Sequence, residues 1–284
     1  MSTRLPVIRF ATELRKTVQQ WRRRGQRVAL VPTMGSLHDG HLSLIRLAKK
    51  HASRVVVSVF VNPTQFAPHE DYNSYPRSEE RDWRKLLSAQ PDAMYAPEVD
   101  EIYPHDFSTR VEVAGVTQTL EGISRPHFFA GVTTVVAKLF LQCLPDVAVF
   151  GEKDYQQLLV VKRMVRDLAF PITILPGPIV REGDGLAMSS RNVYLDPSER
   201  SVAPQLYAIL RDVAKDLASG RPVRESMTQG KVRLEHSGFR IDYLELRDSD
   251  TLMPIEEDSA HARVRLLAAV YLGSVRLIDN VEVA

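Results

Sequence analysis

The sequence predicts an α/β fold in which a Rossmann-like, doubly wound parallel sheet is followed by a smaller α+β domain. Strands and helices alternate between residues 27 and 175, and the run RVVVSVFV at 54–61 is apolar on nearly every residue. A strand without polar alternation has both faces buried, as parallel strands do. The second domain is predicted because helices near 197–219 and 223–237 precede three neighbouring strand candidates.

Each element follows from its periodicity and length. Apolar residues at three- and four-residue spacing predict helices at 10–24, 41–51, 78–89, 131–144 and 154–169. Short apolar runs predict strands at 27–31, 54–61, 92–97, 147–150 and 172–175. The closing strand candidates are FRIDYLELRD, RVRLLAAVYLG and SVRLIDNVEV. We expect the domain boundary near residue 183, with domains at 1–183 and 184–284.

Composition indicates a globular protein of the cytoplasm. The chain has 284 residues, 44% hydrophobic and 25% charged, and its longest apolar stretches are too short to span a bilayer. The first residues carry no apolar core of a signal peptide. The single cysteine, Cys143, cannot form an internal disulfide and lies in the apolar run LFLQCLP, which predicts a packed thiol. A net charge of +2 does not indicate a nucleic-acid-binding protein.

The segment LVPTMGSLHDGH at 30–41 leaves the first core strand and enters a helix. Ligands of open α/β sheets bind beyond the carboxyl ends of the strands, and a helix N-terminus suits phosphate. Gly35 allows backbone close to a ligand, Gly40 leaves room beside the helix start, and His38 and His41 can donate to phosphate oxygens. A capped turn with incidental histidines is one alternative. The other is zinc, for which no obvious further ligands come from Cys143, His51, His69 or His105.

Two further loops leave strand ends at the same predicted sheet edge. In FVNPTQF, Asn62 and Gln65 are neutral amides that can bind hydroxyl or carboxylate groups without burying charge. In FGEKDYQQL, Lys153 offers a cation for phosphate at another helix N-terminus, with Gln157 one turn inside the helix. Each signal is weak alone, because loop amides are common and a lysine beside acids is usually a surface pair.

A fourth loop, GLAMSSRN at 185–192, concentrates the donors Ser189, Ser190 and Arg191. Such a run can wrap a polyphosphate, and Arg191 can clamp it with two hydrogen bonds at once. By itself the run is equally an ST-rich turn. Its coincidence with three loops at one sheet edge favours a nucleotide triphosphate site.

Together these blocks resemble the pantothenate synthetase family. The similarity runs in order through PTMGSLHDGH, FVNPTQF, YPR, LEG, SRP, GEKDYQQL, DGLAMSSRN and the closing RLIDN. The HxGH motif with a Ser-rich loop alone would indicate only the wider nucleotidyltransferase group, which includes class I aminoacyl-tRNA synthetases. The resemblance implies that pantoate and ATP form a pantoyl adenylate with release of pyrophosphate. The amine of β-alanine then displaces AMP. The resemblance also implies a homodimer and Mg²⁺ bound with ATP. We expect the C-terminal domain to act as a lid that keeps water from the adenylate.

The resemblance also implies site residues. His41 takes the family's proton-donor position and acts with His38, Lys153 and Arg191 on the transition state. Gln65 and Gln157 match positions that hold pantoate, with Gln65 also near β-alanine and Asn62 beside it. The ATP segments correspond to Met34, Gly35, Ser36, Leu37, His38, Asp39, Gly40, His41, Gly151, Glu152, Lys153, Asp154, Val180, Met188, Ser189, Ser190 and Arg191. The ligands of Mg²⁺ cannot be assigned from the sequence.

One block departs from the family. Members commonly read SRPGHF where this chain reads SRPHFF, so His127 stands at the usual glycine and Phe128 at the usual histidine. Either His127 substitutes for the usual histidine through a local backbone shift, or the chain works less well than its relatives. We hypothesise that His127 points into the site.

Two other functions stay open from the residues. An adenylyltransferase with a phosphorylated acceptor would need additional cations, whereas FVNPTQF offers neutral amides. The alternative is a catalytically silent nucleotide- or RNA-binding protein. Near-neutral charge and the lack of an aromatic-basic patch argue against RNA, and the presence of His38, His41, Lys153 and the SSR run argues against silence.

Overall fold

A computed structural model describes residues 5–67, 70–255 and 263–283 of the chain. The chain groups into two compact units. Unit one comprises Met1–Glu152 and Val160–Pro178, and unit two comprises Lys153–Leu159 and Ile179–Ala284. The domain division at residue 183 stays a prediction from the sequence.

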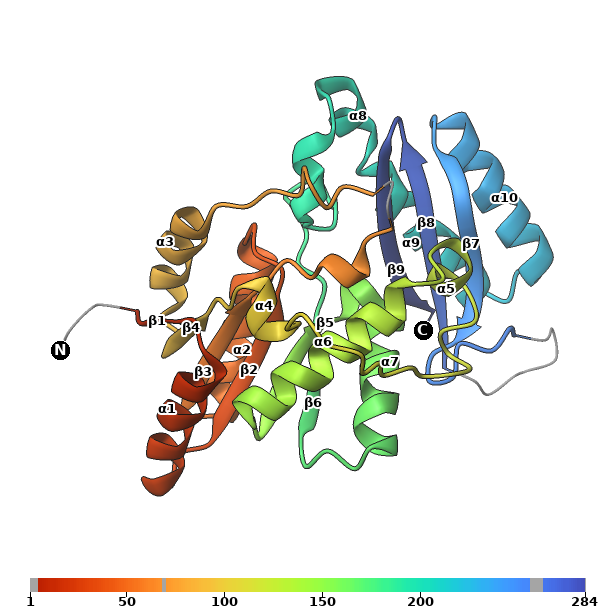
Figure 1. Ribbon diagram of the computed structural model, residues 1–284. Coiled ribbons are helices and arrows are strands. Elements are labelled where there is room, and N and C mark those ends of the chain that lie inside the picture. The colour runs from red at the N-terminus through yellow and green to blue at the C-terminus, as the bar shows by residue number, and fades with distance from the viewer. Residues whose placement is uncertain (1–4, 68–69, 256–262, 284) are drawn as a thin grey trace. The chain divides into compact units, whose positions relative to one another are not determined.

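Unit one contains a six-stranded sheet in the order β1-β4-β3-β2-β5-β6, and every pairing is parallel (Figure 1). Its strands are Val7–Ile8 (β1), Val28–Thr33 (β2), Arg54–Val59 (β3), Ala93–Tyr95 (β4), Val147–Gly151 (β5) and Thr173–Gly177 (β6). The chain runs from β2 through β3 to β4 and then returns to β5 on the other side of β2. Ligands of open α/β sheets bind where the strand order reverses in this way. The predicted doubly wound sheet is confirmed.

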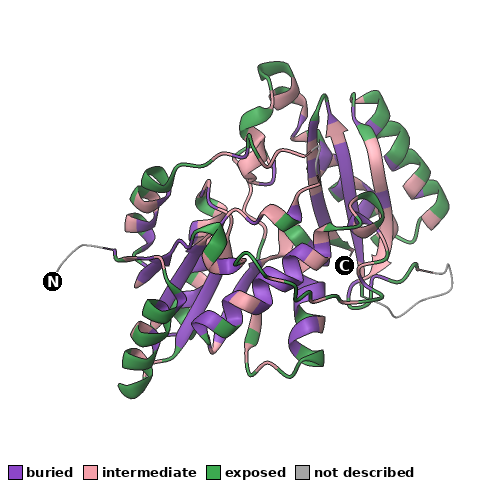
Figure 2. Ribbon diagram, in the orientation of Figure 1, coloured by how far each residue is buried: buried purple, intermediate pink, exposed green. Residues whose placement is uncertain are grey.

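The inner strands of this sheet, β2 to β5, are buried on both faces (Figure 2). On one face, Val31 and Val57 pack with Ile45 of α2 (Asp39–His51) and Leu86 of α3 (Glu79–Ala89). Alternate strand residues point the opposite way, and Leu30 and Val56 are fully buried there. On that side, α1 (Ala11–Arg23) and α6 (Phe128–Cys143) contact β2. The apolar run at 54–61 was therefore interpreted correctly.

The remaining elements of the first 178 residues are short, apart from α7. They are α4 (Val99–Ile102), α5 (Glu121–Ser124), α7 (Tyr155–Asp167), and the 3₁₀ turns η1 (Pro63–Gln65) and η2 (Glu152–Asp154). The sequence predicted α7 but missed β1, α4 and α5, because two to four residues carry no measurable period. Cys143 ends α6 and is 1% exposed. Burial raises the pKa of its thiol to about 12, so the predicted packed thiol is confirmed.

Unit two contains an antiparallel sheet in the order β7-β8-β9. Its named elements are η3 (Ser190–Tyr194), α8 (Pro197–Val202), α9 (Gln205–Ala218), α10 (Val223–His236), β7 (Arg240–Asp248), β8 (Val264–Leu272) and β9 (Val275–Val283). Leu210 of α9 and Leu234 of α10 pack with Leu266 of β8 in one core. The smaller α+β fold is confirmed.

The single helix predicted over 197–219 is wrong. α8 ends at Val202 and α9 begins at Gln205. Pro204 between them has no backbone N–H to continue a helical ladder, and its carbonyl instead accepts from Ala208 as α9 starts. Among the described residues, no helix combines the length and apolar character needed to cross a membrane.

Candidate active site

The loop after β2 is shaped by a buried carboxylate. Gly35 and Ser36 both have positive φ angles, of 81° and 48°. Asp82 of α3 accepts the N–H of Ser36 at 2.9 Å and that of Leu37 at 2.7 Å. A Cβ atom on Gly35 would lie 2.8 Å from Asp82 Oδ2. Gly35 thus has a structural need of its own, because the carboxylate of Asp82 closely approaches it.

Asp82 is a residue that the sequence did not single out. It is 2% exposed, and burial raises the pKa of its carboxyl group while the two backbone hydrogen bonds oppose that rise. Two N–H donors at normal distances hold the loop that leads to His38. The signal in the sequence was an acid on the apolar side of a helix, where a charged side chain needs a buried partner.

The two histidines lie together at the start of α2. His38 is the N-cap residue, with extended backbone, and its N–H donates to Nδ1 of His41 at 3.2 Å. The ring centroids are 4.1 Å apart. Because Nδ1 of His41 accepts a backbone proton, the neutral ring carries its own proton on Nε2. His41 therefore offers an N–H donor on the side of the ring away from the backbone.

The predicted loops of unit one meet at one sheet edge. β2 lies between β3 and β5, so the carboxyl ends of these strands, at Thr33, Val59 and Gly151, are neighbours. The N–H of Phe60 donates to the carbonyl of Thr33 at 3.1 Å, which joins the start of the second loop to that of the first. The structure thus brings the histidine loop and the amide loop to the same edge, as expected.

The amide loop is held by a dense set of hydrogen bonds. Asn62 and Gln65 are 1% and 8% exposed. Nδ2 of Asn62 donates to Oε1 of Gln65 at 2.9 Å and to the carbonyl of Gly131 at 3.1 Å. Direct contact of Asn62 with substrate stays a prediction, and both of its amide protons already have protein acceptors.

Arg125, in the SRP block, anchors this loop. Its guanidinium binds Glu70 through Nε at 2.6 Å and Nη2 at 2.7 Å, and Glu121 through Nη1 at 3.0 Å. Nη2 also donates to the carbonyl of Gln65 at 3.0 Å. Bidentate pairing of this kind is strong and geometrically specific. The sequence used the SRP block for the resemblance and missed this anchoring role.

The departing residues come next in the chain. His127 is exposed and immediately precedes α6. The ring of Phe128 lies over the guanidinium of Arg125, whose central carbon is 4.1 Å from the ring centroid. A catalytic role for His127 stays a prediction, while Phe128 has a packing role against the anchor.

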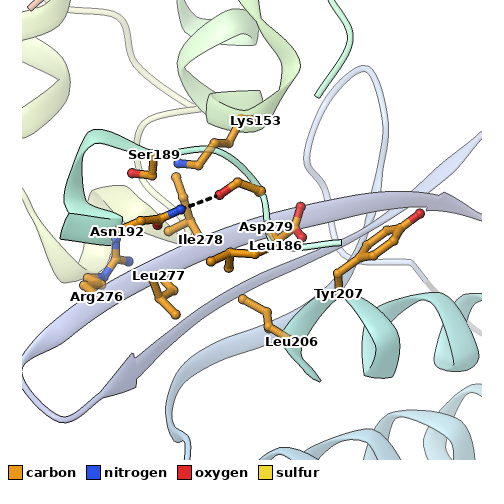
Figure 3. A pocket seen from close by; sticks show the side chains of 11 residues that line it. Lys153, Leu186, Ser189, Asn192, Leu206, Tyr207, Arg276, Leu277, Ile278 and Asp279 are labelled. Carbon is orange, nitrogen blue, oxygen red and sulfur yellow. Dashed lines mark hydrogen bonds between the residues drawn. The ribbon is translucent and has the colours of Figure 1, made fainter. Parts of the chain in front are cut away.

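In unit two, Lys153 and the Ser-rich loop line one pocket (Figure 3). The side chain of Lys153 points toward Ser189 in this view. The hydroxyl of Ser189 accepts the N–H of Arg191 at 3.3 Å, which caps η3. Asn192 Nδ2 donates to the carbonyl of Ala187 at 3.1 Å, the dashed line of Figure 3. Two of the predicted phosphate donors are thus brought together.

The closing RLIDN block fixes the backbone and the arginine side chains around this pocket through hydrogen bonds. Nδ2 of Asn280 donates to the carbonyl of Lys153 at 3.1 Å, and its Oδ1 accepts from Arg265 at 2.7 Å. Asp279 binds both terminal nitrogens of Arg181, at 2.6 and 2.9 Å. The block contributed to the family resemblance, but no structural role was predicted for it from the sequence. Its signal was two adjacent polar residues, Asp279 and Asn280, which break the polar–apolar alternation of the strand.

The zinc alternative and the predicted ATP segments around Val180 and Met188 can now be compared with the structure. Among the described residues, no group of three or more His, Cys, Asp or Glu side chains could hold a metal ion. His69, named in the zinc alternative, lies outside the described residues. Met188 donates its N–H to the carbonyl of Val180 at 3.0 Å, so the ATP segments around them form a short hairpin.

Comparison with known proteins decides the family. The profile described as Pantoate-beta-alanine ligase matches residues 6–282. The chain belongs to the pantoate-β-alanine ligase family. It is 54% identical to the pantothenate synthetase of Rhodospirillum rubrum over 280 residues, covering 98% of this chain and 99% of that one. It is 52% identical to that of Rhodopseudomonas palustris over 283 residues, covering 99% and 100%.

Solved structures of the family agree with this fold. The pantothenate synthetase of Thermus thermophilus superposes with a TM-score of 0.93 at 47% identity, covering 98% of this chain and 99% of that one. The pantoate-β-alanine ligase of Francisella tularensis, solved with a β,γ-ATP compound and β-alanine, gives a TM-score of 0.83 at 32% identity and 98% coverage of both chains. The predicted family, ligase class and fold are therefore confirmed.

Proposed function

We propose that this chain condenses pantoate with β-alanine through a pantoyl adenylate, using the loop residues described above. A carboxylate oxygen of pantoate attacks the α-phosphorus of ATP, and the bond from that phosphorus to the bridging oxygen breaks with release of pyrophosphate. The amine of β-alanine then attacks the acyl carbon and expels AMP. The protein needs no covalent nucleophile for this sequence, because positioning and charge stabilisation supply the catalysis.

His41 donates a hydrogen bond from Nε2 to a phosphate oxygen as negative charge builds on it. The observation that carries this role is the N–H of His38 donating to Nδ1 of His41, which leaves Nε2 protonated in the neutral ring. His38 shares the task through its ring, 4.1 Å away. The N-terminus of α2 adds a favourable field for the same charge.

Lys153 and Arg191 are the proposed cations for the phosphate chain. Both come from the segments that match the family's ATP residues, and Ser189 lines the same pocket as Lys153. Preplaced positive charges of this kind bind the transition state more strongly than ground-state ATP, because negative charge is transferred to the departing pyrophosphate. A guanidinium can also bind two phosphate oxygens at once.

Gln65 and Gln157 are the proposed contacts for pantoate, with Gln65 also adjoining the β-alanine position. Gln65 is the better supported of the two, because its backbone is tied to Arg125 and its side chain to Asn62. Neutral amides suit a substrate with a carboxylate and hydroxyl groups, since they pair with both without neutralising the nucleophile.

Mg²⁺ is proposed to enter with ATP. Among the described residues no group of three or more His, Cys, Asp or Glu side chains could hold a metal ion, and both oxygens of the buried Asp82 accept backbone N–H groups. This fits an ion carried mainly by phosphate oxygens and water, the usual state of Mg²⁺ beside nucleotides. When bound, the ion neutralises charge on the triphosphate. We also propose a cytoplasmic homodimer, consistent with the single buried thiol and with the family.

The test is pantoate-dependent exchange of labelled pyrophosphate into ATP. Reversible adenylate formation predicts exchange that requires pantoate and proceeds without β-alanine. Exchange in the absence of pantoate, or ATP binding with no exchange at all, would contradict the proposal. A phosphorylated acceptor that replaces pantoate in the assay would instead support an adenylyltransferase.

A further inference from the structure

The side-chain amide of Gln65 has a fixed direction, and backbone groups fix it. The N–H of Thr64 can only donate, and it points to Oδ1 of Asn62 at 3.3 Å. The carbonyl of Gly131 can only accept, and it lies 3.1 Å from Nδ2 of Asn62. Exchanging oxygen and nitrogen of the Asn62 amide would oppose donor to donor and acceptor to acceptor. The orientation of Asn62 is therefore determined by the backbone.

Asn62 passes this orientation on to Gln65. Its Nδ2 is a donor, so the atom of Gln65 that lies 2.9 Å away must be the acceptor Oε1. The Nε2 group of Gln65 then faces away from Asn62. Gln65 is 8% exposed, and among the described residues no hydrogen bond from its Nε2 is found. This amide nitrogen is not one of the fully buried side-chain atoms without a partner among the described residues, so a ligand or water can reach it and accept its protons.

Tyr103 completes the relay. Its hydroxyl donates to Oδ1 of Asn62 at 2.8 Å, the shortest of the three bonds to that oxygen. The phenol follows α4 and packs against Phe60 and Phe107, with ring centroids 6.3 and 5.1 Å away. These contacts hold the hydroxyl in place against the amide.

The close packing of α6 keeps the relay rigid. A Cβ atom on Gly131 would lie 2.4 Å from the carbonyl oxygen of Thr64, so the helix approaches the loop as closely as glycine allows. Arg125 holds the carbonyl of Gln65 at 3.0 Å from the other side. The backbone of Gln65 is thus fixed independently of its side chain, whose amide direction follows from Asn62, which backbone groups orient and the Tyr103 hydroxyl helps to hold in place.

We propose that Tyr103 is a positioning residue which, through Asn62, makes Gln65 present a hydrogen-bond donor and not an acceptor to a substrate oxygen. The inference rests on the proposed contact between Gln65 and pantoate. It adds a specificity rule: the pocket selects an oxygen that accepts, such as a carboxylate or an alcohol, and disfavours a group that can only donate. Neither Tyr103 nor the direction of Gln65 was evident from the sequence.

Three variants test the relay through steady-state kinetics with varied pantoate. Tyr103→Phe removes the hydroxyl that donates to Asn62 and also lies 3.3 Å from Oγ1 of Thr64, and should raise KM for pantoate about three- to tenfold with a smaller change in kcat. Asn62→Asp can only accept, so Gln65 must turn its Nε2 toward residue 62 and face substrate with Oε1. KM should then rise by roughly tenfold to a hundredfold. Gln65→Glu keeps an acceptor for Asn62 but removes the donor, and should raise KM at least as much as Asn62→Asp.

A pH series gives a readout that a purely structural role would not move. In Gln65→Glu, protonation of the new carboxyl restores an O–H donor, so the ratio of variant to wild-type KM should fall as the pH is lowered toward 5. The ratio for Tyr103→Phe should stay constant across the same range. A Gln65→Glu ratio that is independent of pH would overturn the donor assignment.

Tyr95→Phe is the matched control. Tyr95 lies in unit one as Tyr103 does, is fully buried where Tyr103 is half-buried, and its hydroxyl donates to an amide oxygen, Oε1 of Gln142, at 2.9 Å. It should lose stability like Tyr103→Phe but keep its KM for pantoate within twofold. If Tyr103→Phe and Asn62→Asp also keep KM within twofold while the wild-type enzyme shows pantoate-dependent exchange, the relay is wrong and the proposed function stands. A wild-type chain without that exchange refutes the proposed function itself.

Discussion

Replacing Gly35 by alanine should destabilise unit one through two separable effects. The first is backbone strain, because φ at Gly35 is 81° and a Cβ atom in the left-handed region costs about 1–2 kcal/mol, partly offset by lower entropy of the unfolded chain. The second is contact, since the new atom would lie 2.8 Å from Asp82 Oδ2 and 3.2 Å from Val59 Cγ1. Asp82 cannot retreat without losing the N–H groups of Ser36 and Leu37.

The contact adds roughly 1–3 kcal/mol, the usual cost of overpacking, so Gly35→Ala should cost about 2–4 kcal/mol in total. Gly25→Ala isolates the backbone effect, because Gly25 has φ of 70° and no atom within 4 Å of an added Cβ. It should cost about 1 kcal/mol. The difference between the two variants measures how closely Asp82 holds the histidine loop.

Urea unfolding followed by tryptophan fluorescence suits this comparison. The chain has two tryptophans, Trp21 and Trp83, and both lie in unit one. Trp83 neighbours Asp82 and donates its indole N–H to the carbonyl of Leu5 at 3.1 Å. In an Asp82→Ala background the penalty of Gly35→Ala should fall toward that of Gly25→Ala. Equal penalties for Gly25→Ala and Gly35→Ala in the wild-type background would show that the close approach of Asp82 adds nothing to the cost at residue 35.

Four further outcomes follow from the same contacts. Lys153→Ala should slow adenylate formation by on the order of 10²-fold or more, measured as pyrophosphate exchange; a loss of tenfold or less would contradict its place at the phosphates. Asp279→Ala removes the carboxylate partner of the largely buried Arg181 and should destabilise unit two by about 3 kcal/mol in circular dichroism melts, whereas Asp250→Ala, in an exposed pair with Arg263, should change little; equal effects would be evidence against the anchoring role. Cys143, whose thiol has a pKa of about 12, should resist a thiol reagent at pH 8 until urea unfolds the chain, and stoichiometric labelling of the native protein within minutes would disprove its burial. ATP with pantoate should protect residues 181–192 from protease if the C-terminal domain closes as a lid, and unchanged cleavage would argue against closure.

The parallel sheet was predictable because its strands are buried on both faces. The run at 54–61 is apolar on nearly every residue, that at 147–150 is apolar on every residue, and the helices between them carry a clear period. The helix predicted at 197–219 is divided at Pro204, although the helical spacing of apolar residues continues across that position. Proline interrupts the helix because it lacks a backbone N–H, and the spacing of apolar residues does not report this. Strands of two residues such as β1 depend on pairing with a distant partner, here β4, which periodicity does not reveal.

The candidate site divides in the same way. Residues proposed to touch substrate, such as His41, Lys153 and Gln65, were identifiable because they follow strand ends in recognisable motifs. Residues that hold them were missed, because their partners are far away in sequence: Asp82 is separated from Leu37 by 45 positions and Asn280 from Lys153 by 127. The local sequence around either residue does not indicate which distant residue it pairs with.

The most direct test of the account follows an oxygen atom from substrate to product. Pantoate labelled with heavy oxygen in its carboxylate is incubated with ATP, β-alanine and the purified protein, and the nucleotide products are analysed by mass spectrometry. Attack on the α-phosphorus predicts AMP that carries one labelled oxygen for each pantothenate formed. Unlabelled AMP, or ADP with the label in inorganic phosphate, would contradict the adenylate mechanism.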